Sequence, residues 1–186
     1  MRKLLYLALA AISLMWITIS CDDNSSWNTY EKWRVDNEEW LAKQETLTNP
    51  DGTPYYTKIV PGWYPKSGVL IHYFNDRSLT EGNLEPLVNS TVDVKYIGRL
   101  YNDEAFDSSY NNTAWGDSIF RFQPLNTIVG WQIALTNMRV GDSARVVIPF
   151  MEAYGVSTTS AAIPPYSNLV FDIKLVDIYR YEMSNN

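Results

Sequence analysis

Residues 169–176 read L-V-F-D-I-K-L-V, and this stretch decides the fold class because an apolar side chain recurs at every second position. The recurring residues are Leu169, Phe171, Ile173 and Leu175. Side chains point alternately to the two faces of a strand, so a period of two predicts a β-strand with one buried and one wet face. Residues 92–97 and 144–148 repeat the pattern, and residues 68–73 are expected to form a further strand.

One short helix is expected among these strands. The apolar residues spaced at i, i+3, i+4 and i+7 are Trp131, Ala134, Leu135 and Met138. That spacing places them on one face of a helix. Gly130 precedes the helix and Gly141 follows it. Strands, a short helix and strands again predict an α+β fold, in which the helix lies against one face of an antiparallel sheet.

Composition excludes several classes of function. The chain has 186 residues, a formal net charge of -6, one Cys and one His. An acidic chain lacks the basic surface that grips a phosphate backbone, so nucleic acid is not an expected partner. One Cys excludes an internal disulfide, and one His excludes a metal site built on two imidazoles. The Asp and Glu residues show no EF-hand spacing, so no metal site is predicted.

Residues 1–20 are expected to be a secretory signal. Arg2 and Lys3 precede an apolar run at residues 4–19, which stops just before Cys21. The segment resembles a bacterial lipoprotein signal. That resemblance implies that Cys21 is lipidated and anchors the protein in the cell envelope, at the outer membrane or facing the periplasm. The alternative is an ordinary signal peptide with an incidental cysteine.

Residues 21–53 are expected to form a helical extension outside the sheet domain. The pattern predicts one amphipathic helix over residues 25–44, with its large apolar side chains at Trp27, Tyr30, Trp33, Trp40 and Leu41. Asn28 and Glu31 could cap this helix, and the N-P-D-G sequence at residues 49–52 predicts a turn after it. The helix can pack on the domain, pair two copies of the chain or bind a partner, so the oligomeric state stays open.

Short motifs in the remainder of the chain resemble one family. In order, they are V-D-V-K-Y-I-G-R-L at residues 92–100, F-D-S-S at 106–109, G-W at 130–131, M-R-V-G at 138–141, E-A-Y-G at 152–155 and I-P-P-Y-S-N-L-V-F-D-I-K-L at 163–175. Their order and spacing are similar to those of FK506-binding (FKBP-type) peptidyl-prolyl cis-trans isomerases. The resemblance is strongest over residues 92–178 and implies an isomerase domain at residues 54–182. It implies an FKBP-like fold, with a twisted antiparallel sheet wrapped around one short α-helix, as the periodicity also indicates.

The resemblance implies an apolar pocket that binds proline. The indole of Trp131 would form its floor, with Ile128 and Ile163 at the rim. The aromatic walls would be Tyr96, Phe106, Phe120 and Phe171. Without the motif order, aromatic residues at alternating strand positions would be interpreted as ordinary core.

Three polar groups are also implied by the resemblance. The hydroxyl of Tyr154 and the backbone N–H of Ile128 would donate hydrogen bonds to substrate carbonyls. Asp107 would accept a hydrogen bond from the hydroxyl of Tyr96 in the catalytic site. Taken alone, the D-S-S sequence that begins at Asp107 would be interpreted as turn chemistry.

The implied reaction is rotation about Xaa-Pro peptide bonds, which needs no cofactor. Proline-containing polypeptides, exported proteins that are folding among them, are the expected partners, together with FK506-like macrolides. Three departures from the family pattern keep a second reading open, that of a peptide-binding or chaperone module with little turnover. Residues 110–119 lack the Arg that often pairs with Asp107, the loop before I-P-P carries Thr159 and Ala162 in place of a His and a bulky apolar residue, and residues 122–128 form a shorter link.

Overall fold

The computed structural model describes residues 26–65, 68–111, 114–157 and 162–181. The expected signal segment, Cys21 and Thr159 lie outside the described residues. Within these four ranges, no helix has both the length and the apolar character needed to cross a bilayer.

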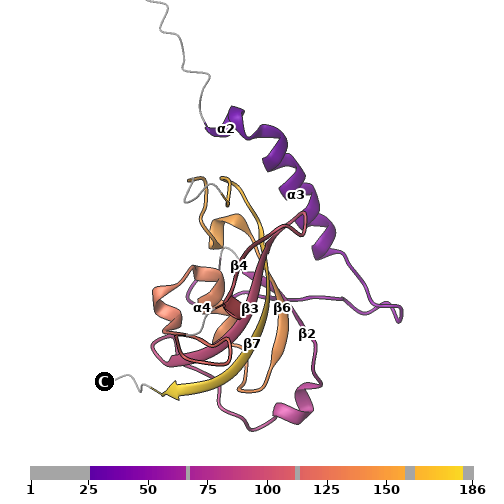
Figure 1. Cartoon of the computed structure of the whole chain (residues 1–186). Helices are drawn as coiled ribbons and strands as arrows, with labels where there is room; N and C mark the ends of the chain where they lie inside the picture. Colours follow the sequence, from indigo (N-terminus) through magenta and orange to yellow (C-terminus); the bar gives the residue numbers. More distant parts are fainter. Residues whose placement is uncertain (1–25, 66–67, 112–113, 158–161, 182–186) are drawn as a thin grey trace, which may run out of the picture.

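The described residues form one antiparallel sheet with a small number of helices (Figure 1). The strands are β1 (Thr57–Ile59), β2 (Val69–Tyr73), β3 (Thr91–Leu100), β4 (Ala105–Ser108), β5 (Phe120–Phe122), β6 (Ser143–Ile148) and β7 (Leu169–Arg180). The α-helices are α2 (Ser26–Thr29), α3 (Glu31–Glu45) and α4 (Val129–Leu135). Short 3-10 helices are η1 (Arg77–Thr80), η2 (Ser109–Asn111), η3 (Pro124–Asn126) and η4 (Phe150–Glu152).

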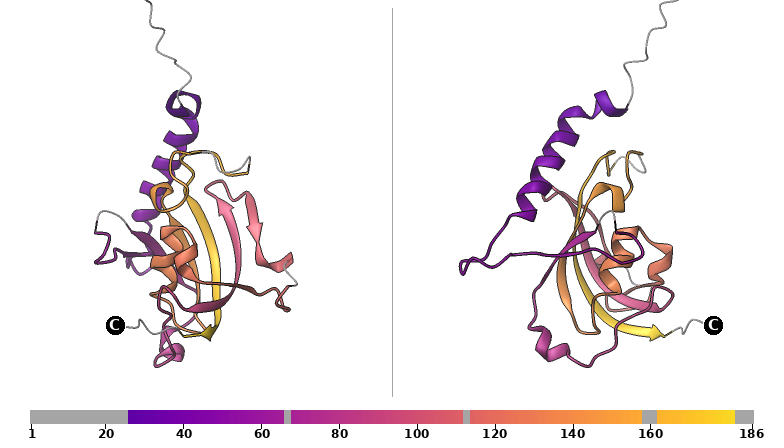
Figure 2. Two further views of the ribbon diagram at one scale, coloured as in Figure 1. Left: turned by 90° about the vertical axis from the view of Figure 1, so that its left-hand side faces the viewer. Right: turned by 180° about the vertical axis from the view of Figure 1, so that it is seen from behind.

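The sheet wraps around α4, which confirms the predicted fold class. Its strand order is β1-β2-β6-β7-β3-β4, and β5 pairs with the first half of β3. Figures 1 and 2 show the long strands β3, β6 and β7 curving around α4, which lies on their concave side. Apolar side chains of α4 and of these strands together form the main hydrophobic core. The short helix therefore has one face inside a curved sheet and its N-terminal end at the sheet's open side.

The alternating pattern in β7 is confirmed from residue 171 onward, but Val170, expected on the wet face, is only 7% exposed. Its apolar odd-numbered side chains from Leu169 to Leu175 are buried, whereas Asp172 is half-buried and Lys174 is exposed. In β3 one side chain differs from the simple pattern, because Asp93 was expected on the wet face and is only 7% exposed. Its carboxylate is satisfied there by Arg121 of β5, whose Nε and Nη2 each donate a hydrogen bond at 2.6 Å.

The helix predicted from Trp131 to Met138 is shorter and begins earlier in the structure. It runs Val129–Leu135, so Gly130 lies inside it and Met138 follows its end, although Met138 is still fully buried. A Cβ on Gly130 would lie 2.3 Å from a methyl carbon of Ile148 in β6. A side chain of any size would therefore push α4 away from the sheet.

The expected N-terminal helix is present but interrupted. Tyr30 (φ -108°, ψ 19°) separates α2 from α3 and is the N-cap of α3, so Asn28 does not occupy the N-cap position that was predicted for it. Beyond the break, Trp27 meets Tyr166 edge to face at 5.8 Å between ring centroids. The turn predicted at residues 49–52 is confirmed, with Gly52 at φ 83° donating from its N–H to the Asn49 carbonyl over 2.9 Å.

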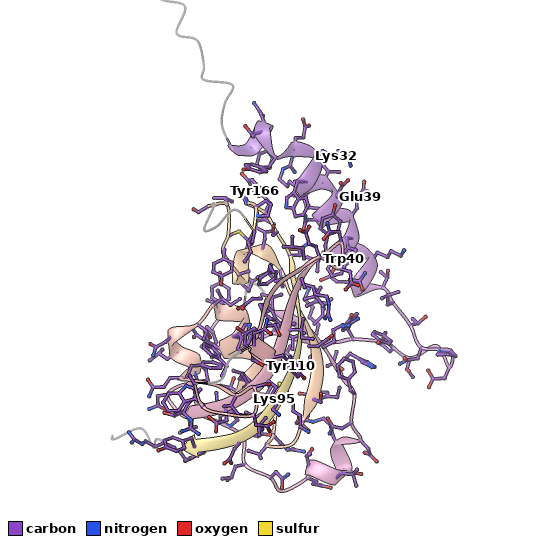
Figure 3. The ribbon with its side chains drawn as sticks, in the orientation of Figure 1. Lys32, Glu39, Trp40, Lys95, Tyr110 and Tyr166 are labelled. Atoms are coloured by element: carbon purple, nitrogen blue, oxygen red, sulfur yellow. The ribbon has the colours of Figure 1, made fainter. Side chains whose placement is uncertain are left out.

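The helical extension packs on the domain, which was one of the three roles expected for it. The ring of Tyr101, at the turn after β3, contacts Trp33 at 4.9 Å and Trp40 at 6.4 Å between centroids. A second, smaller core lies between the extension and the sheet, made of Tyr56, Leu70 and Val147 with Trp40, Leu41, Leu47 and Tyr55 against them. In Figure 3, Trp40 lies toward the sheet, while Lys32 and Glu39 lie on the outer side of α3.

Candidate active site

A cavity of about 440 Å³ opens between the N-terminal end of α4 and the concave face of the sheet. It is lined by Tyr96, Phe106, Asp107, Phe120, Asn126, Thr127, Ile128, Trp131, Tyr154 and Phe171. These residues come from β3, β4, β5, β7, the η3–α4 segment and the turn after η4. Pockets for small ligands commonly have a few hundred cubic ångströms and a mostly apolar lining with a few polar groups, and this cavity fits that description.

The rings that line the cavity hold one another in place. Trp131 is only 5% exposed and meets Tyr96 at 5.0 Å and Phe171 at 5.1 Å, both edge to face. Phe106 contacts Phe171 at 5.6 Å, and Phe120 contacts Tyr96 at 5.8 Å between centroids. Aromatic pairs in this arrangement contribute about 0.5–1.5 kcal/mol each beyond their burial. The apolar surface of the cavity is therefore preformed and rigid.

Strand register explains why these rings meet. In the β3–β7 ladder, Tyr96 is opposite Ile173 and Gly98 is opposite Phe171. A Cβ on Gly98 would lie 2.7 Å from the Phe171 ring and 2.8 Å from the Phe106 ring. Only glycine at this strand position leaves room for both rings, which connects the G of the V-D-V-K-Y-I-G-R-L motif directly to the shape of the cavity.

Tyr96 and Asp107 form the best-defined polar contact of the cavity. The Tyr96 hydroxyl donates to Asp107 Oδ2 over 2.6 Å, and the Ser108 N–H donates to Asp107 Oδ1 over 2.8 Å. Burial first, and the hydrogen bond to the Asp107 carboxylate second, raise the pKa of Tyr96 well above its ordinary value. Within the described part of the chain, no Lys, Arg or His nitrogen lies within salt-bridge distance of Asp107. Two neutral donors thus hold this carboxylate.

Two donors in the cavity lack an internal acceptor. Among the described residues, none accepts a hydrogen bond from the Tyr154 hydroxyl or from the Ile128 N–H. The Ile128 carbonyl, by contrast, accepts from the N–H groups of Trp131 (3.0 Å) and Gln132 (3.3 Å) at the start of α4. Partial burial first, and the negative charge of Asp107 second, raise the pKa of Tyr154, so its hydroxyl keeps its proton at neutral pH.

The structure brings most of the expected site residues together. Those that line the one cavity are Tyr96, Phe106, Asp107, Phe120, Ile128, Trp131, Tyr154 and Phe171. Ile163 was expected at the rim but is not among the residues that line the cavity; it belongs to the main core and is 7% exposed. Pro164 and Pro165 follow it directly, and the chain there turns its apolar side chain inward. Cys21, the expected lipidation site, lies outside the described residues.

Asn126 and Thr127 line the cavity and were not among the predicted residues. Asn126 ends η3, and Thr127 lies between it and Ile128, the N-cap of α4. The Thr127 hydroxyl donates to the Pro124 carbonyl over 2.6 Å, and Gln132 Nε2 donates to the Thr127 carbonyl over 3.0 Å. Their position just before Ile128 was the available signal. Polar residues in a short link, however, give no periodic pattern from which to predict that they face a pocket.

The lone histidine takes a structural position. His72 Nδ1 lies 2.8 Å from the Tyr55 carbonyl oxygen, and its ring stacks on that of Tyr55 at 3.9 Å with an interplanar angle of 8°. His72 does not line the aromatic cavity.

Comparison with known proteins places this arrangement in a family. The sequence profile described as "FKBP-type peptidyl-prolyl cis-trans isomerase" matches residues 82–176. The chain is 40% identical over 97 residues to a macrophage infectivity potentiator of Trypanosoma cruzi. The aligned residues cover 52% of this chain and 47% of that protein. The chain spans about half or less of the length of the curated relatives at the head of the comparison.

Two solved structures are similar in fold and in sequence. A peptidyl-prolyl cis-trans isomerase from Pseudomonas syringae aligns with a TM-score of 0.62 and 26% identity, over 80% of this chain and 94% of that one. FkpA from Escherichia coli aligns with a TM-score of 0.62 and 28% identity, over 83% of this chain and 64% of that one. The profile match covers β3 to β6, α4 and most of β7, and it includes every residue that lines the cavity. The chain therefore belongs to the family of FKBP-type peptidyl-prolyl cis-trans isomerases.

Proposed function

We propose that this chain catalyses cis-trans isomerisation of Xaa-Pro peptide bonds in polypeptides that bind their proline ring in the aromatic cavity. The observation that carries the proposal is the cavity itself, which has a volume of about 440 Å³ and is lined by buried Trp131 and five more aromatic rings. Family membership supports the same activity. The proline ring would lie on the indole of Trp131, flanked by Tyr96 and Phe171.

Rotation about the amide bond breaks no covalent bond, so the protein must lower a torsional barrier. That barrier is about 18–20 kcal/mol, and it arises from the resonance that keeps the amide planar and polar. Water stabilises the planar, polar form more than the twisted form. Transfer of the amide into an apolar cavity removes part of that preference, and a barrier lower by about 4–8 kcal/mol corresponds to a rate increase of about 10³- to 10⁶-fold.

Two donors are available to the substrate. The single hydroxyl proton of Tyr96 is donated to Asp107, so Tyr96 and Asp107 act as a unit. The Tyr154 hydroxyl and the Ile128 N–H line the same cavity and are free to meet carbonyl oxygens of the bound chain. A donor to the rotating carbonyl would strengthen resonance and slow rotation, so these groups must favour the twisted geometry or bind neighbouring carbonyls.

A second function, peptide binding with little turnover, is favoured by the surroundings of Asp107. This carboxylate has Tyr96 and the Ser108 N–H as partners, and residues 110–119 provide no Arg to pair with it. A different charge balance beside the rotating amide could leave affinity intact while lowering the rate. Binding and turnover must therefore be measured separately.

The decisive measurement is exchange of a short Xaa-Pro peptide between its cis and trans forms, followed by NMR at increasing protein concentration. Isomerisation well above the uncatalysed rate, with loss of activity on addition of an FK506-like macrolide, is expected. Trp131→Ala, which removes the base of the cavity, is expected to abolish both binding and activity. Peptide that binds without faster exchange would support the binding-module alternative, and no binding would refute both functions.

For the cellular role, we propose that Cys21 carries a lipid anchor and that the clients are exported proteins in the bacterial envelope. The support is the sequence pattern of a charged start and an apolar run that stops just before Cys21. Incorporation of labelled fatty acid into the full chain, and its loss in Cys21→Ser, tests the anchor. An unlabelled wild-type protein would leave the ordinary signal peptide as the explanation.

A further inference from the structure

The N-terminal helices contact the loop that leads into β7, and they do so at three consecutive residues. Trp27 meets the ring of Tyr166, and Trp33 Nε1 donates to Ser167 Oγ over 3.1 Å. Asn168, the third residue, bonds to α3 through Asn37. In Figure 3, Tyr166 lies in the loop beside the N-terminal end of α3. The extension is thus docked on the residues that immediately precede strand β7.

Asn37 is the central contact of this interface. It is fully buried, and it is the buried residue of α3. Its Oδ1 accepts from the Asn168 N–H over 2.8 Å, and its backbone carbonyl accepts from Asn168 Nδ2 over 2.6 Å. Its own Nδ2 donates to the Trp33 carbonyl over 2.8 Å, one turn earlier in the helix. A buried amide with all these bonds fixes the position of its partner in a way that an apolar side chain does not.

Asn168 passes this constraint to a second loop. It is 1% exposed, and its Oδ1 accepts from the Phe150 N–H over 2.9 Å. Phe150 is the first residue of η4, the short helix that precedes Tyr154 in the chain. One asparagine therefore ties the α3 helix to the start of the turn on which Tyr154 lies.

The other end of that turn is also fixed from the same loop. The Gly155 N–H donates to the Phe150 carbonyl over 2.8 Å, and the Tyr166 N–H donates to the Gly155 carbonyl over 3.0 Å. Tyr154, whose hydroxyl is one of the two donors proposed above, lies between these two anchored positions and lines the cavity. The position of this hydroxyl thus depends on a chain of bonds that begins at Asn37 and runs through Asn168 and Phe150.

We propose that Asn37 is a positioning residue for the aromatic cavity: by holding Asn168, it sets the place of Tyr154 in the site. This inference rests on the isomerase activity proposed above. It gives the N-terminal helix a role in turnover, because displacement of α3 would loosen a donor at the site without touching the rings. Misplacement of a catalytic group by about 1 Å can cost up to about 100-fold in rate, so the effect is measurable.

A pair of matched variants tests the proposal in the full chain. Asn37→Leu keeps the buried position filled and introduces a good helix former, but it removes the acceptor of the Asn168 N–H. Tyr101→Phe is the control, because it removes another bond between α3 and the domain, from the Tyr101 hydroxyl to Asp36 at 3.3 Å, far in the sequence from the loops that carry Tyr154. If leucine does not fit, Asn37→Ala removes the same acceptor and is still compatible with a helix.

Isomerisation is measured for each variant alone and in combination with Tyr154→Phe. Asn37→Leu is expected to lower kcat/KM about tenfold in the wild-type background and less than about twofold when Tyr154→Phe is present. Tyr101→Phe is expected to stay within about twofold of the wild type. Equal losses from Asn37→Leu in both backgrounds, or no loss at all, would overturn the proposal, since a general structural defect would not depend on the Tyr154 hydroxyl.

Amide hydrogen exchange provides a readout that does not require isomerase activity. The N–H groups of Phe150 and Gly155 are expected to exchange at least about tenfold faster in Asn37→Leu and at the wild-type rate in Tyr101→Phe. Unchanged exchange at both amides would refute the positioning role even if the protein is an active isomerase. Conversely, the wild-type protein could lack isomerase activity while these amides still exchange faster in Asn37→Leu. That result would retain the link between Asn37 and the turn that carries Tyr154, and it would reject the proposed function.

Discussion

Replacement of Gly98 by alanine is expected to damage the cavity through a single methyl group. The added Cβ would lie 2.7 Å from the Phe171 ring and 2.8 Å from the Phe106 ring. Carbon atoms pack comfortably at about 3.5–4.0 Å, so each ring must move by about 0.7–1.3 Å. Phe171 also meets Trp131 at 5.1 Å, which means that this movement disturbs the base of the cavity as well as its wall.

The size of the effect follows from two opposing contributions. An extra methyl in a packed core costs about 1–3 kcal/mol. Alanine in a strand regains about 0.5–1 kcal/mol relative to glycine, because the unfolded chain loses conformational freedom. The net loss in the free energy of unfolding is therefore about 0–2.5 kcal/mol, and each kcal/mol corresponds to about 2–4 °C in Tm for a chain of this size. Affinity for a proline-containing peptide is expected to fall about tenfold or more, because the cavity is reshaped.

Urea-induced unfolding and peptide titration calorimetry measure the two quantities. Gly62→Ala is the matched control, because a Cβ at that position meets no atom within 4 Å and its φ is not in the left-handed region. That variant should unfold and bind peptide like the wild type, or be slightly more stable. Gly98→Ala with unchanged unfolding and unchanged peptide affinity would show that the two rings do not lie against β3 as described.

Three further variants give direct tests. Tyr154→Phe should lower isomerisation about tenfold while the free energy of unfolding changes by less than about 1 kcal/mol, measured by peptide exchange and urea titration; a fully active variant would remove its hydroxyl from the mechanism. Asp107→Asn should lower turnover and, in a spectrophotometric titration, bring the pKa of Tyr96 down toward its ordinary value, because the adjacent negative charge is gone; an unchanged titration would contradict the 2.6 Å contact. Burial by itself raises the pKa of Asp172, but hydrogen bonds and positive charge from Arg145 and then Arg99 outweigh it and lower the pKa. This group therefore contributes stability above about pH 4, which is lost as the pH falls through its folded-state pKa. Asp172→Asn should cost about 1–3 kcal/mol at pH 7 and progressively less as the pH falls below about 4; a cost that does not change with pH would refute the linkage.

The strands and α4 could be predicted from the sequence because their signals are local. In β7 every second side chain is apolar over several residues, and the buried face repeats that pattern. In α4 the i, i+3, i+4 spacing is short but still sufficient. Its ends were less well predicted, because Met138 is buried in the turn after the helix and apolar burial alone does not separate a helix from the turn that follows it.

The cavity required more information than periodicity. Alternation predicts that Tyr96 and Phe171 share a buried face, but not whether that face is filled or hollow. The hollow depends on Gly98, on the loop before Ile128 and on the turn around Tyr154, which have no repeating pattern. Here the order of motifs, and not the chemistry of any one residue, predicted which rings meet.

The role of α3 could not be predicted at all from its own sequence. Asn37 is a polar residue in a polar helix, and such a position is ordinarily exposed. Its partner Asn168 is 131 residues away, and only the folded sheet brings the two together. The break at Tyr30 could not be predicted from the sequence either, because no Gly or Pro lies at that position.

The division of the site between rigid and loop elements implies that affinity and rate can be altered separately. The rings of Trp131, Tyr96 and Phe171 lie on a helix and on central strands, and they interlock within one core. The Tyr154 hydroxyl instead lies on a turn whose position depends on hydrogen bonds from the loop before β7. Ring variants should therefore weaken peptide binding and turnover together, whereas variants that displace this turn, such as Asn37→Leu in α3, should lower turnover with little change in peptide Kd. If both kinds of variant changed Kd and rate in the same proportion, the donor on the turn would contribute to ground-state binding and not to passage over the barrier.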